Sequence, residues 1–282
     1  MDSLAGLARQ LKSVSDLGEL VKTMKVLAAV NLRTLAKTSE ALDAYLHNAE
    51  NGLQVVLREL PQPEADDQDV REITMVVFGS DHGLCGPFHQ QLLQELARCP
   101  KHATLLCVGT RLAEAAEDLG LKVNGVLSAP TSAAALAEAA EGLLQKLQPF
   151  QGAVRLLYQR TQNTGYQPCQ ETLWPIESDW LRQLRACPWP APGAPMCWGP
   201  AGPAFAWLLE EHLQVACQRA LAHSLASENQ ARLLTMQAAE KNLEEMRLGL
   251  QDSLRSRRQN AVTEELLDVI SGFEMLNEGL QR

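Results

Sequence analysis

The sequence lacks proline at both of its ends. All 14 prolines fall between Pro61 and Pro203, so the first 60 and the last 79 residues contain none. At the usual proline frequency of about 5%, stretches of this length would hold several. Twelve of the 18 glycines also lie in the middle. Because proline and glycine interrupt helices, this distribution excludes a uniform globule and favours two long helical arms around a loop-rich centre.

Membrane-spanning and secretory signals are missing as well. No stretch is suited to a membrane-spanning helix, and the first residues, MDSLAGLARQLKS, lack the basic leader and apolar block of a signal peptide. The seven cysteines (85, 99, 107, 169, 187, 197 and 217) form no CxxC pair and have no metal-ligand spacing. We therefore expect a reduced, cytosolic protein without a metal site or cofactor.

The charge balance excludes a further class of partner. A net charge of -9 and a pI near 5.2 lack the basic stripe that nucleic-acid phosphates require. The same argument disfavours an anionic membrane surface as a direct partner, and we expect no direct membrane insertion.

The N-terminal arm carries a coiled-coil pattern. Sixteen positions spaced alternately by three and four residues are apolar in all but three cases. The positions are Leu4, Leu7, Leu11, Val14, Gly18, Val21, Lys25, Ala28, Leu32, Leu35, Ser39, Leu42, Leu46, Ala49, Leu53 and Val56. Such a narrow stripe is what a helix needs to pack along a partner helix.

The C-terminal arm ends with a second stripe of this kind. It consists of Val262, Leu266, Val269, Phe273, Leu276 and Leu280. A looser apolar pattern precedes it, and a polar, basic patch over residues 255–260 separates the two. This interruption predicts a contact other than the partner helix.

Length decides how the arms are arranged. A helix over residues 3–58 would extend about 84 Å, and one over 204–280 about 115 Å. A compact chain of this size is only roughly 50 Å across. We therefore predict an α/β protein in which the N- and C-terminal helices form a long antiparallel coiled coil beside a central, Rossmann-like α/β domain. The expected division is a helix over 1–60, the domain over 72–190, a proline-rich linker over 191–203 and a helix over 204–282.

The middle of the chain alternates between strand and helix patterns. Apolar runs predict strands at 73–79, 104–109, 153–159 and 171–176, with helices at 88–99, 110–119 and 131–147. This alternation is typical of a small, mostly parallel sheet covered on both faces.

The loop at residues 79–86, GSDHGLCG, is the most enzyme-like string. It follows a strand and precedes a helix, where phosphates bind in many α/β proteins. However, it lacks the GxxxxGK[ST] pattern and any basic residue. Ser80, Asp81, His82 and Cys85 are also too close in sequence to favour a catalytic triad. We therefore interpret the loop as a tight turn, and we predict no catalytic residue.

Three blocks of the sequence resemble signatures of the γ subunit of F-type ATP synthases. Residues 21–29, VKTMKVLAA, resemble TKAMKMVAA, and residues 80–86, SDHGLCG, resemble SDRGLCG. The stretch from ASEN at 226–229 to RQNAVTEEL at 258–266 resembles ASE…ARQASITQEL. Their order and separation agree, so the resemblance covers nearly the whole chain.

The sequence also departs from this family's pattern. His82 replaces the usual arginine, Asn260 replaces a small residue, and SDLGEL at 15–20 replaces an NTQKIT-like lead-in. The lead-in and the ending at Leu27–Val30 resemble the divergent bacterial branch called N-ATPases. The redox insert of chloroplast γ subunits has no match, so thiol regulation of that type is not expected.

The resemblance implies a rotor shaft and a set of partners. The coiled coil would turn inside a ring of three α and three β subunits, and the α/β domain would rest with ε on the c-ring. The complex would be peripheral on the cytoplasmic face of the bacterial inner membrane. Contacts to β transfer to Met24, Arg258, Gln259 and Thr263, and the adjacent charges of Lys22, Lys25 and Arg257 fit the same interface.

Two other functions share some of these features. A stand-alone coiled-coil scaffold would have the arms but no reason to carry the three blocks in order. A nucleotide-binding α/β enzyme would bind ATP or NAD as an isolated chain. Taken alone, the charges at Lys22, Lys25 and Arg257 also fit an ordinary solvated helix face. The sequence leaves open whether protons or sodium ions drive the complex, and whether synthesis or pumping dominates.

Overall fold

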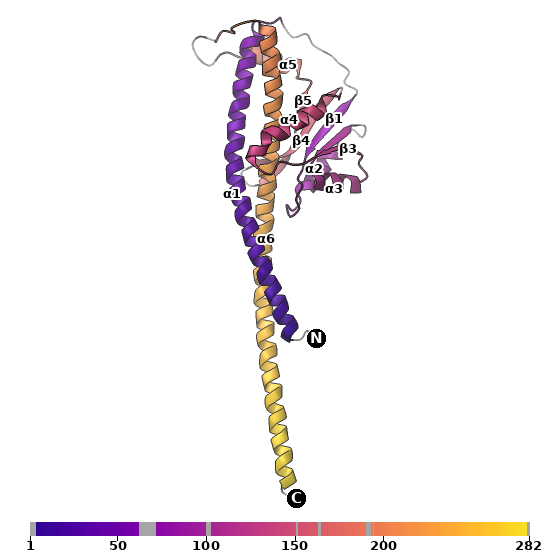
Figure 1. Ribbon diagram of the computed structural model, residues 1–282, viewed down its shortest axis with the longest axis vertical. Helices are drawn as coiled ribbons and strands as arrows, with labels where there is room; N and C mark the ends of the chain where they lie inside the picture. Colours follow the sequence, from indigo (N-terminus) through magenta and orange to yellow (C-terminus); the bar gives the residue numbers. More distant parts are fainter. Residues whose placement is uncertain are drawn as a thin grey trace. The chain divides into compact units, whose positions relative to one another are not determined.

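The computed structural model describes residues 4–61, 72–99, 103–150, 152–162, 165–189, 193 and 195–280, with side-chain burial up to residue 271. The chain divides into two compact units. One consists of Met1–Val26 with Leu234–Arg282, and the other is Leu27–Leu233. Helices α1, Leu4–Leu57, and α6, Ala201–Leu280, contribute to both units (Figure 1).

The heptad pattern predicted for α1 is confirmed by burial. Among the sixteen predicted positions, Leu4 is the single exposed one, at 39%, and the others are buried or half-buried. Ser39, a polar exception in the pattern, is buried, and Lys25 is half-buried. Periodicity alone therefore identified the packed face of this helix, because only a 3-4 spacing keeps one stripe against a neighbour.

Helix α6 begins at Ala201, slightly before the residue predicted from the last proline. Pro203 lies in its first turn, where a backbone N–H has no intrahelical acceptor, so proline costs little there. In the described part of the last stripe, Val262, Leu266 and Val269 are exposed by 52%, 58% and 64%. Phe273, Leu276 and Leu280 lie outside the residues whose burial is described.

The central unit is built on a five-stranded sheet. Its strands are β1 Ile73–Phe78, β2 Thr104–Val108, β3 Val123–Leu127, β4 Ala153–Gln162 and β5 Gly165–Trp174, in the order β3-β2-β1-β4-β5. The first four run parallel, and β5 pairs with β4 in the antiparallel sense. The mostly parallel sheet is therefore confirmed.

Helices cover both faces of this sheet (Figure 1). Val76 and Phe78 of β1 pack with α4, Leu136–Leu147, and with α6. Met75 and Val77 point the other way, toward α2, Phe88–Leu96, and α3, Thr110–Asp118. A 3-10 turn at Ala133–Ala135 precedes α4, and α5 spans Ser178–Ala186. Because β1 is buried on both faces, nearly all of its residues are apolar.

Three elements differ from the expectation. Strand β3, VNGVL, contains a glycine and an asparagine, and its edge position leaves no residue of it fully buried. Strand β5 begins at Gly165 and forms a hairpin with β4, so the predicted strand at 171–176 is its second half shifted by two residues. Helix α5 lies in a segment that the sequence did not assign. Short elements at the edge of a sheet are stabilised mainly by contacts with neighbouring elements. Their own sequences therefore carry only a weak pattern of apolar and polar residues.

Candidate functional site

The loop after β1 is held by its own side chains. The Asp81 carboxylate accepts hydrogen bonds from the backbone N–H of Thr110, at 2.7 Å, and of Ala129, at 2.9 Å. Thr110 is the first residue of α3, so Asp81 caps a helix whose N-cap residue, Gly109, has no side chain. The carboxylate occupies the place where a phosphate would meet the helix N-terminus. The loop therefore serves the fold, as its interpretation as a tight turn predicted.

The polar groups of this loop contact one another and His89. Ser80 Oγ lies 3.3 Å from Nε2 of His89, and Cys85 Sγ lies 4.0 Å from its Nδ1. Ser80 donates through its hydroxyl to the His82 carbonyl oxygen, at 2.7 Å, and its backbone N–H donates to Nε2 of His89, at 3.2 Å. Burial, followed by the charges of Arg111 and Arg232, lowers the pKa of His89 to about 4. Burial likewise raises the pKa of the Cys85 thiol. Burial therefore disfavours the charged forms of both the His89 imidazole and the Cys85 thiol.

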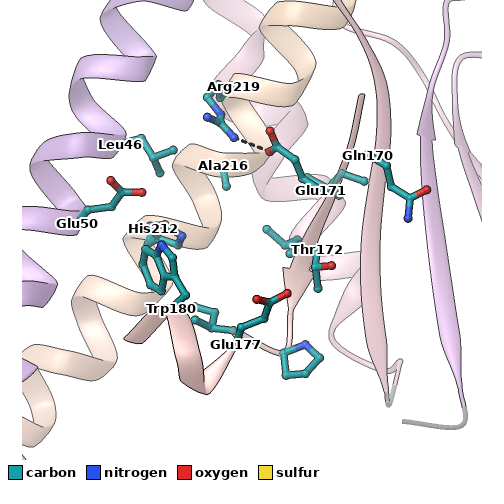
Figure 2. A pocket seen from close by; sticks show the side chains of 14 residues that line it. Leu46, Glu50, Gln170, Glu171, Thr172, Glu177, Trp180, His212, Ala216 and Arg219 are labelled. Carbon is teal, nitrogen blue, oxygen red and sulfur yellow. Dashed lines mark hydrogen bonds and ion pairs between the residues drawn. The ribbon is translucent and has the colours of Figure 1, made fainter. Parts of the chain in front are cut away.

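A polar cavity lies beside the sheet in the same unit. It has a volume of about 440 Å³ and is lined mainly by residues from α1, β4, β5, α5 and α6. Figure 2 shows its lining side chains. Glu50, Glu177 and Trp180 surround it, and the Trp180 ring lies against His212 with centroids 5.3 Å apart. Burial and then the charge of Arg219 lower the pKa of His212. Within this lining, Arg219 pairs with Glu171 at 2.5 Å.

The first predicted contact group lies on α1 in the other unit. Lys22 is exposed, whereas Met24 and Lys25 are half-buried. Lys25 Nζ forms an ion pair with the Glu240 carboxylate of α6 at 2.5 Å. Lys25 therefore links the two helices at a heptad position, while Lys22 lies on the wall of an adjacent groove of about 590 Å³.

The second predicted contact group lies on α6 in that unit. Arg257, Arg258, Gln259 and Thr263 are all exposed. Arg258, Gln259 and Thr263 line a broad groove of about 1030 Å³, together with Leu11 of α1. Within the described residues, Arg257 and Arg258 form no ion pair, so both guanidinium groups remain available.

Exposed apolar side chains mark two surfaces that the predicted contact list missed. On α1, Leu17 and Leu20, which are neighbours on the helix surface, are exposed by 50% and 61%. In the central unit, Met196, Trp198 and Trp207 are exposed by 84%, 98% and 63%. The sequence carried a signal for the second surface, because residues 186–209 contain no charged side chain and all five tryptophans lie at positions 174–207. Exposed apolar patches of this kind are typical of interaction sites.

Searches for two other kinds of site gave negative results within the described residues. No group of three or more His, Cys, Asp or Glu side chains there is arranged to hold a metal ion. None of the helices in the described ranges combines the length and the apolar character needed to cross a membrane.

Comparison with known proteins agrees with this geometry. A family model described as ATP synthase matches residues 3–276. The ATP synthase gamma chain of Desulforamulus reducens is 25% identical over 288 residues, covering 98% of this chain and 100% of the relative. That of Cupriavidus necator is 26% identical over 282 residues, covering 93% and 96%.

Solved structures share the fold. A chain of the Euglena gracilis mitochondrial ATP synthase, from a cryo-electron microscopy structure of OSCP, F1 and the c-ring in rotational state 3, aligns with a TM-score of 0.74 and 17% identity. The alignment covers 99% of this chain and 96% of that one. Since the family model spans almost the whole sequence and the relatives are gamma chains along their full length, this chain belongs to the ATP synthase γ-chain family.

Proposed function

We propose that this chain is the central rotor shaft of an F1Fo ATP synthase or ATPase. In this role it couples proton or sodium flow across a membrane to ATP synthesis or hydrolysis in a ring of three α and three β subunits. The ε subunit and the c-ring are its other partners.

One observation carries the proposal beyond family membership. The end of α6 presents Val262, Leu266, Leu267, Val269 and Ile270 to solvent, each exposed by more than half. A helix with this much uncovered apolar surface is typical of an element that is buried in a complex. The interior of an α3β3 ring would supply that cover.

The predicted β contacts fit the same arrangement. Lys22, Arg257, Arg258, Gln259 and Thr263 are exposed, and neither Arg257 nor Arg258 has an ion pair among the described residues, so both can pair with carboxylates of a partner. Met24 is half-buried and lies between the exposed Leu20 and Val26 on α1. Lys25 acts by a different route, since its pairing with Glu240 orients the helix that carries Lys22 and Met24.

The uncharged surface around Met196, Trp198 and Trp207 is the proposed contact with ε or the c-ring. Its large, exposed side chains would gain hydrophobic free energy by packing against a neighbouring subunit. In this proposal the chain is divided into coiled-coil helices at 1–60 and 204–282, the α/β domain at 72–190 and the proline-rich linker at 191–203. Met196 and Trp198 lie on the linker and Trp207 on α6.

The chain has no catalytic site of its own in this proposal, because the nucleotide sites belong to the α and β subunits. The internal capping by Asp81 and the neutral His89 support that assignment. The complex would be peripheral on the cytoplasmic face of a bacterial inner membrane. We propose further that the chain belongs to the N-ATPase branch, a proposal supported by the lead-in at 15–20 and the ending at Leu27–Val30.

Co-expression with the α and β subunits tests the proposal. One copy of the chain should co-purify with each ring, and ATP hydrolysis by the ring should depend on its presence. A variant lacking residues 262–282 is the matched control, since it keeps the α/β domain but loses the exposed apolar end. If the full chain binds no ring, the proposal is wrong.

Arg258→Glu tests the contact residues. Reversing an exposed, unpaired charge should leave the fold intact but weaken the coupling between hydrolysis and rotation, because a partner carboxylate would then be repelled. Arg98→Glu, two residues after the end of α2, is the control, because Arg98 is also exposed, lies outside the three signature blocks and pairs only with the neighbouring Glu95 among the described ion pairs. Unchanged torque and coupling in Arg258→Glu would contradict the assignment.

A further inference from the structure

Five side chains form a ring of electrostatic, hydrogen-bonding and ring-stacking contacts within the central unit. Asp43 comes from α1, Arg219 and His223 come from α6, Tyr158 from β4 and Glu171 from β5. The ring therefore joins both long helices to two strands of the sheet. Figure 2 shows the Arg219–Glu171 part of it at the edge of the polar cavity.

Two contacts in the ring, Arg219–Glu171 and Tyr158–Glu171, are hydrogen bonds, and the others are longer electrostatic or ring-stacking contacts. Arg219 reaches the Glu171 carboxylate with one terminal nitrogen at 2.5 Å and the Asp43 carboxylate with the other at 3.7 Å. The Tyr158 hydroxyl donates to the second oxygen of Glu171, at 2.7 Å. The His223 ring stacks on Tyr158, with centroids 6.1 Å apart, and its Nε2 lies 3.8 Å from Asp43.

Arg219 is the one cation that holds both carboxylates of this ring. Its side chain is only 16% exposed, against 30% for Glu171 and 40% for Asp43. Removing it would leave Glu171 partly buried without its ion-pair partner, which is more damaging than losing an exposed pair. The guanidinium fork suits this bridging role, because its nitrogens reach two acceptors in fixed directions.

The apolar part of the same interface presents a smooth surface of small side chains. The residues of α6 that pack on the sheet are mostly small: Val215, Ala216, Cys217, Ala220, Leu221 and Ala222. Small side chains make shallow ridges, and hydrophobic burial is non-directional. Such a surface therefore opposes the separation of α6 from the sheet more strongly than it opposes sliding of one along the other. Directional contacts must therefore fix the angle between the sheet and the helices.

Other polar contacts at this interface join fewer elements. Ser224 donates to the Phe78 carbonyl oxygen and Ser227 to that of Gln159, so both connect α6 with the sheet. Gln54 of α1 donates to the Cys187 carbonyl oxygen, after α5. The ring around Arg219 is the contact that reaches α1, α6 and the sheet together.

We propose that Arg219 is a positioning residue that fixes the angle at which the α/β domain is held on α1 and α6. This inference rests on the proposed rotor function, in which torque passes between that domain and the helices. Loss of Arg219 would make the junction more compliant, so that rotation of the domain no longer follows rotation of the helices closely.

The test uses the complete complex in membrane vesicles. ATP hydrolysis and ion pumping are measured together for the unmodified chain, Arg219→Met and Arg219→Lys. We expect Arg219→Met to assemble and hydrolyse ATP while pumping per ATP falls by roughly twofold to tenfold. Arg219→Lys keeps the charge without the fork, so it should restore pumping in part.

Leu93→Ala is the control that distinguishes the proposed positioning role of Arg219 from a general loss of stability. Leu93 is 6% exposed in the core on the α2 side of the sheet, so this variant should lower the melting temperature and leave pumping per ATP unchanged. If Arg219→Met does not assemble, Tyr158→Phe replaces it, since it removes a single hydroxyl. That variant must then pump less per ATP than Leu93→Ala.

The outcomes distinguish the two proposals. If the unmodified chain binds no ring, the rotor function itself is wrong. If the unmodified complex pumps and Arg219→Met pumps equally well per ATP, only the positioning role is wrong. An equal fall in pumping in Leu93→Ala would also overturn it, because stability alone would then explain the effect.

Discussion

At the scale of single residues, the γ signature around Asp81 is explained by the fold. A carboxylate that accepts from two backbone N–H groups joins the loop after β1 to the start of α3 and to the segment before α4. Gly109 is required beside it, because its φ is +105° and a Cβ there would lie 2.5 Å from the Ser80 backbone nitrogen. The motif therefore positions the backbone of three segments.

Asp81→Asn should destabilise the α/β domain by about 1–3 kcal/mol. The amide keeps one acceptor but loses the charge at the helix N-terminus, and one backbone N–H remains unpaired. Urea unfolding followed by circular dichroism measures the change. Asp118→Asn, at the opposite end of α3, is the control, because a negative charge near a helix C-terminus is not stabilising. An equal loss in both variants would contradict the capping role.

His89 should make stability depend on pH below about 6.5. Its folded pKa of about 4 lies below the ordinary value of 6.5, so the unfolded chain takes up a proton first as the pH falls. The contribution of neutral His89 to the free energy of unfolding is fully present above pH 6.5. It is lost progressively as the pH falls toward 4, by up to about 3 kcal/mol. Burial lowers the pKa of His212 and His223 in the same direction.

Urea unfolding at pH 7.5, 6 and 5 measures this dependence. His89→Gln keeps an acceptor for the Ser80 N–H but cannot titrate, so its stability should fall less steeply with acid. A slope identical to that of the unmodified chain would show that His89 does not contribute.

At the scale of secondary-structure elements, packing follows the heptad pattern of α1. Leu53 lies on the predicted stripe and is completely buried, whereas Leu27 lies off it and is 58% exposed. Both belong to the same helix and the same compact unit. The position on the stripe therefore decides what each leucine contributes to stability.

Leu53→Ala should cost about 2–5 kcal/mol, because it leaves a cavity in a packed interface. Leu27→Ala should change stability by less than about 0.5 kcal/mol, as exposed substitutions usually do. Thermal and urea unfolding of the two variants provide a matched comparison. Similar losses in both would mean that the stripe is not the packed face.

At the same scale, sequence reasoning succeeded where an element carries its own pattern. The buried strand β1, the helices α2 and α3 and the stripe of α1 were all predicted closely, since their periodicity follows from burial on known faces. Strand β3 and helix α5 were missed, and β5 was only half recognised. Val126 and Trp174, on the two edge strands, are exposed. Because these strands are only partly buried, their sequences do not show the apolar pattern of a buried strand.

At the scale of the whole molecule, exposed apolar surface indicates assembly. The end of α6 and the segment around Trp198 both present large side chains to solvent. Neither surface contributes to the fold of its own unit, so changes there should separate assembly from stability.

Leu266→Ser combined with Val269→Ser should weaken binding to the α3β3 ring by about tenfold or more, because both side chains are proposed to be buried there. The unfolding midpoint should not change. Titration of the fluorescently labelled chain with rings measures the affinity. Leu119→Ser, 65% exposed in the α/β domain, is the control. Tight binding by the double variant would contradict the proposed contact.

The sequence by itself determined the two proline-free helices, the heptad stripe, the central domain of alternating strands and helices, and the family signatures. Each of these features depends on the spacing of residues that are close together in the chain. The tertiary structure decided which polar residues are used internally. Lys25 pairs across the helices, Asp81 caps a helix, and Arg219 bridges α1 to β5. These pairings join residues far apart in the chain, and only folding brings such charges within a few ångströms, where their interaction is strong enough to matter.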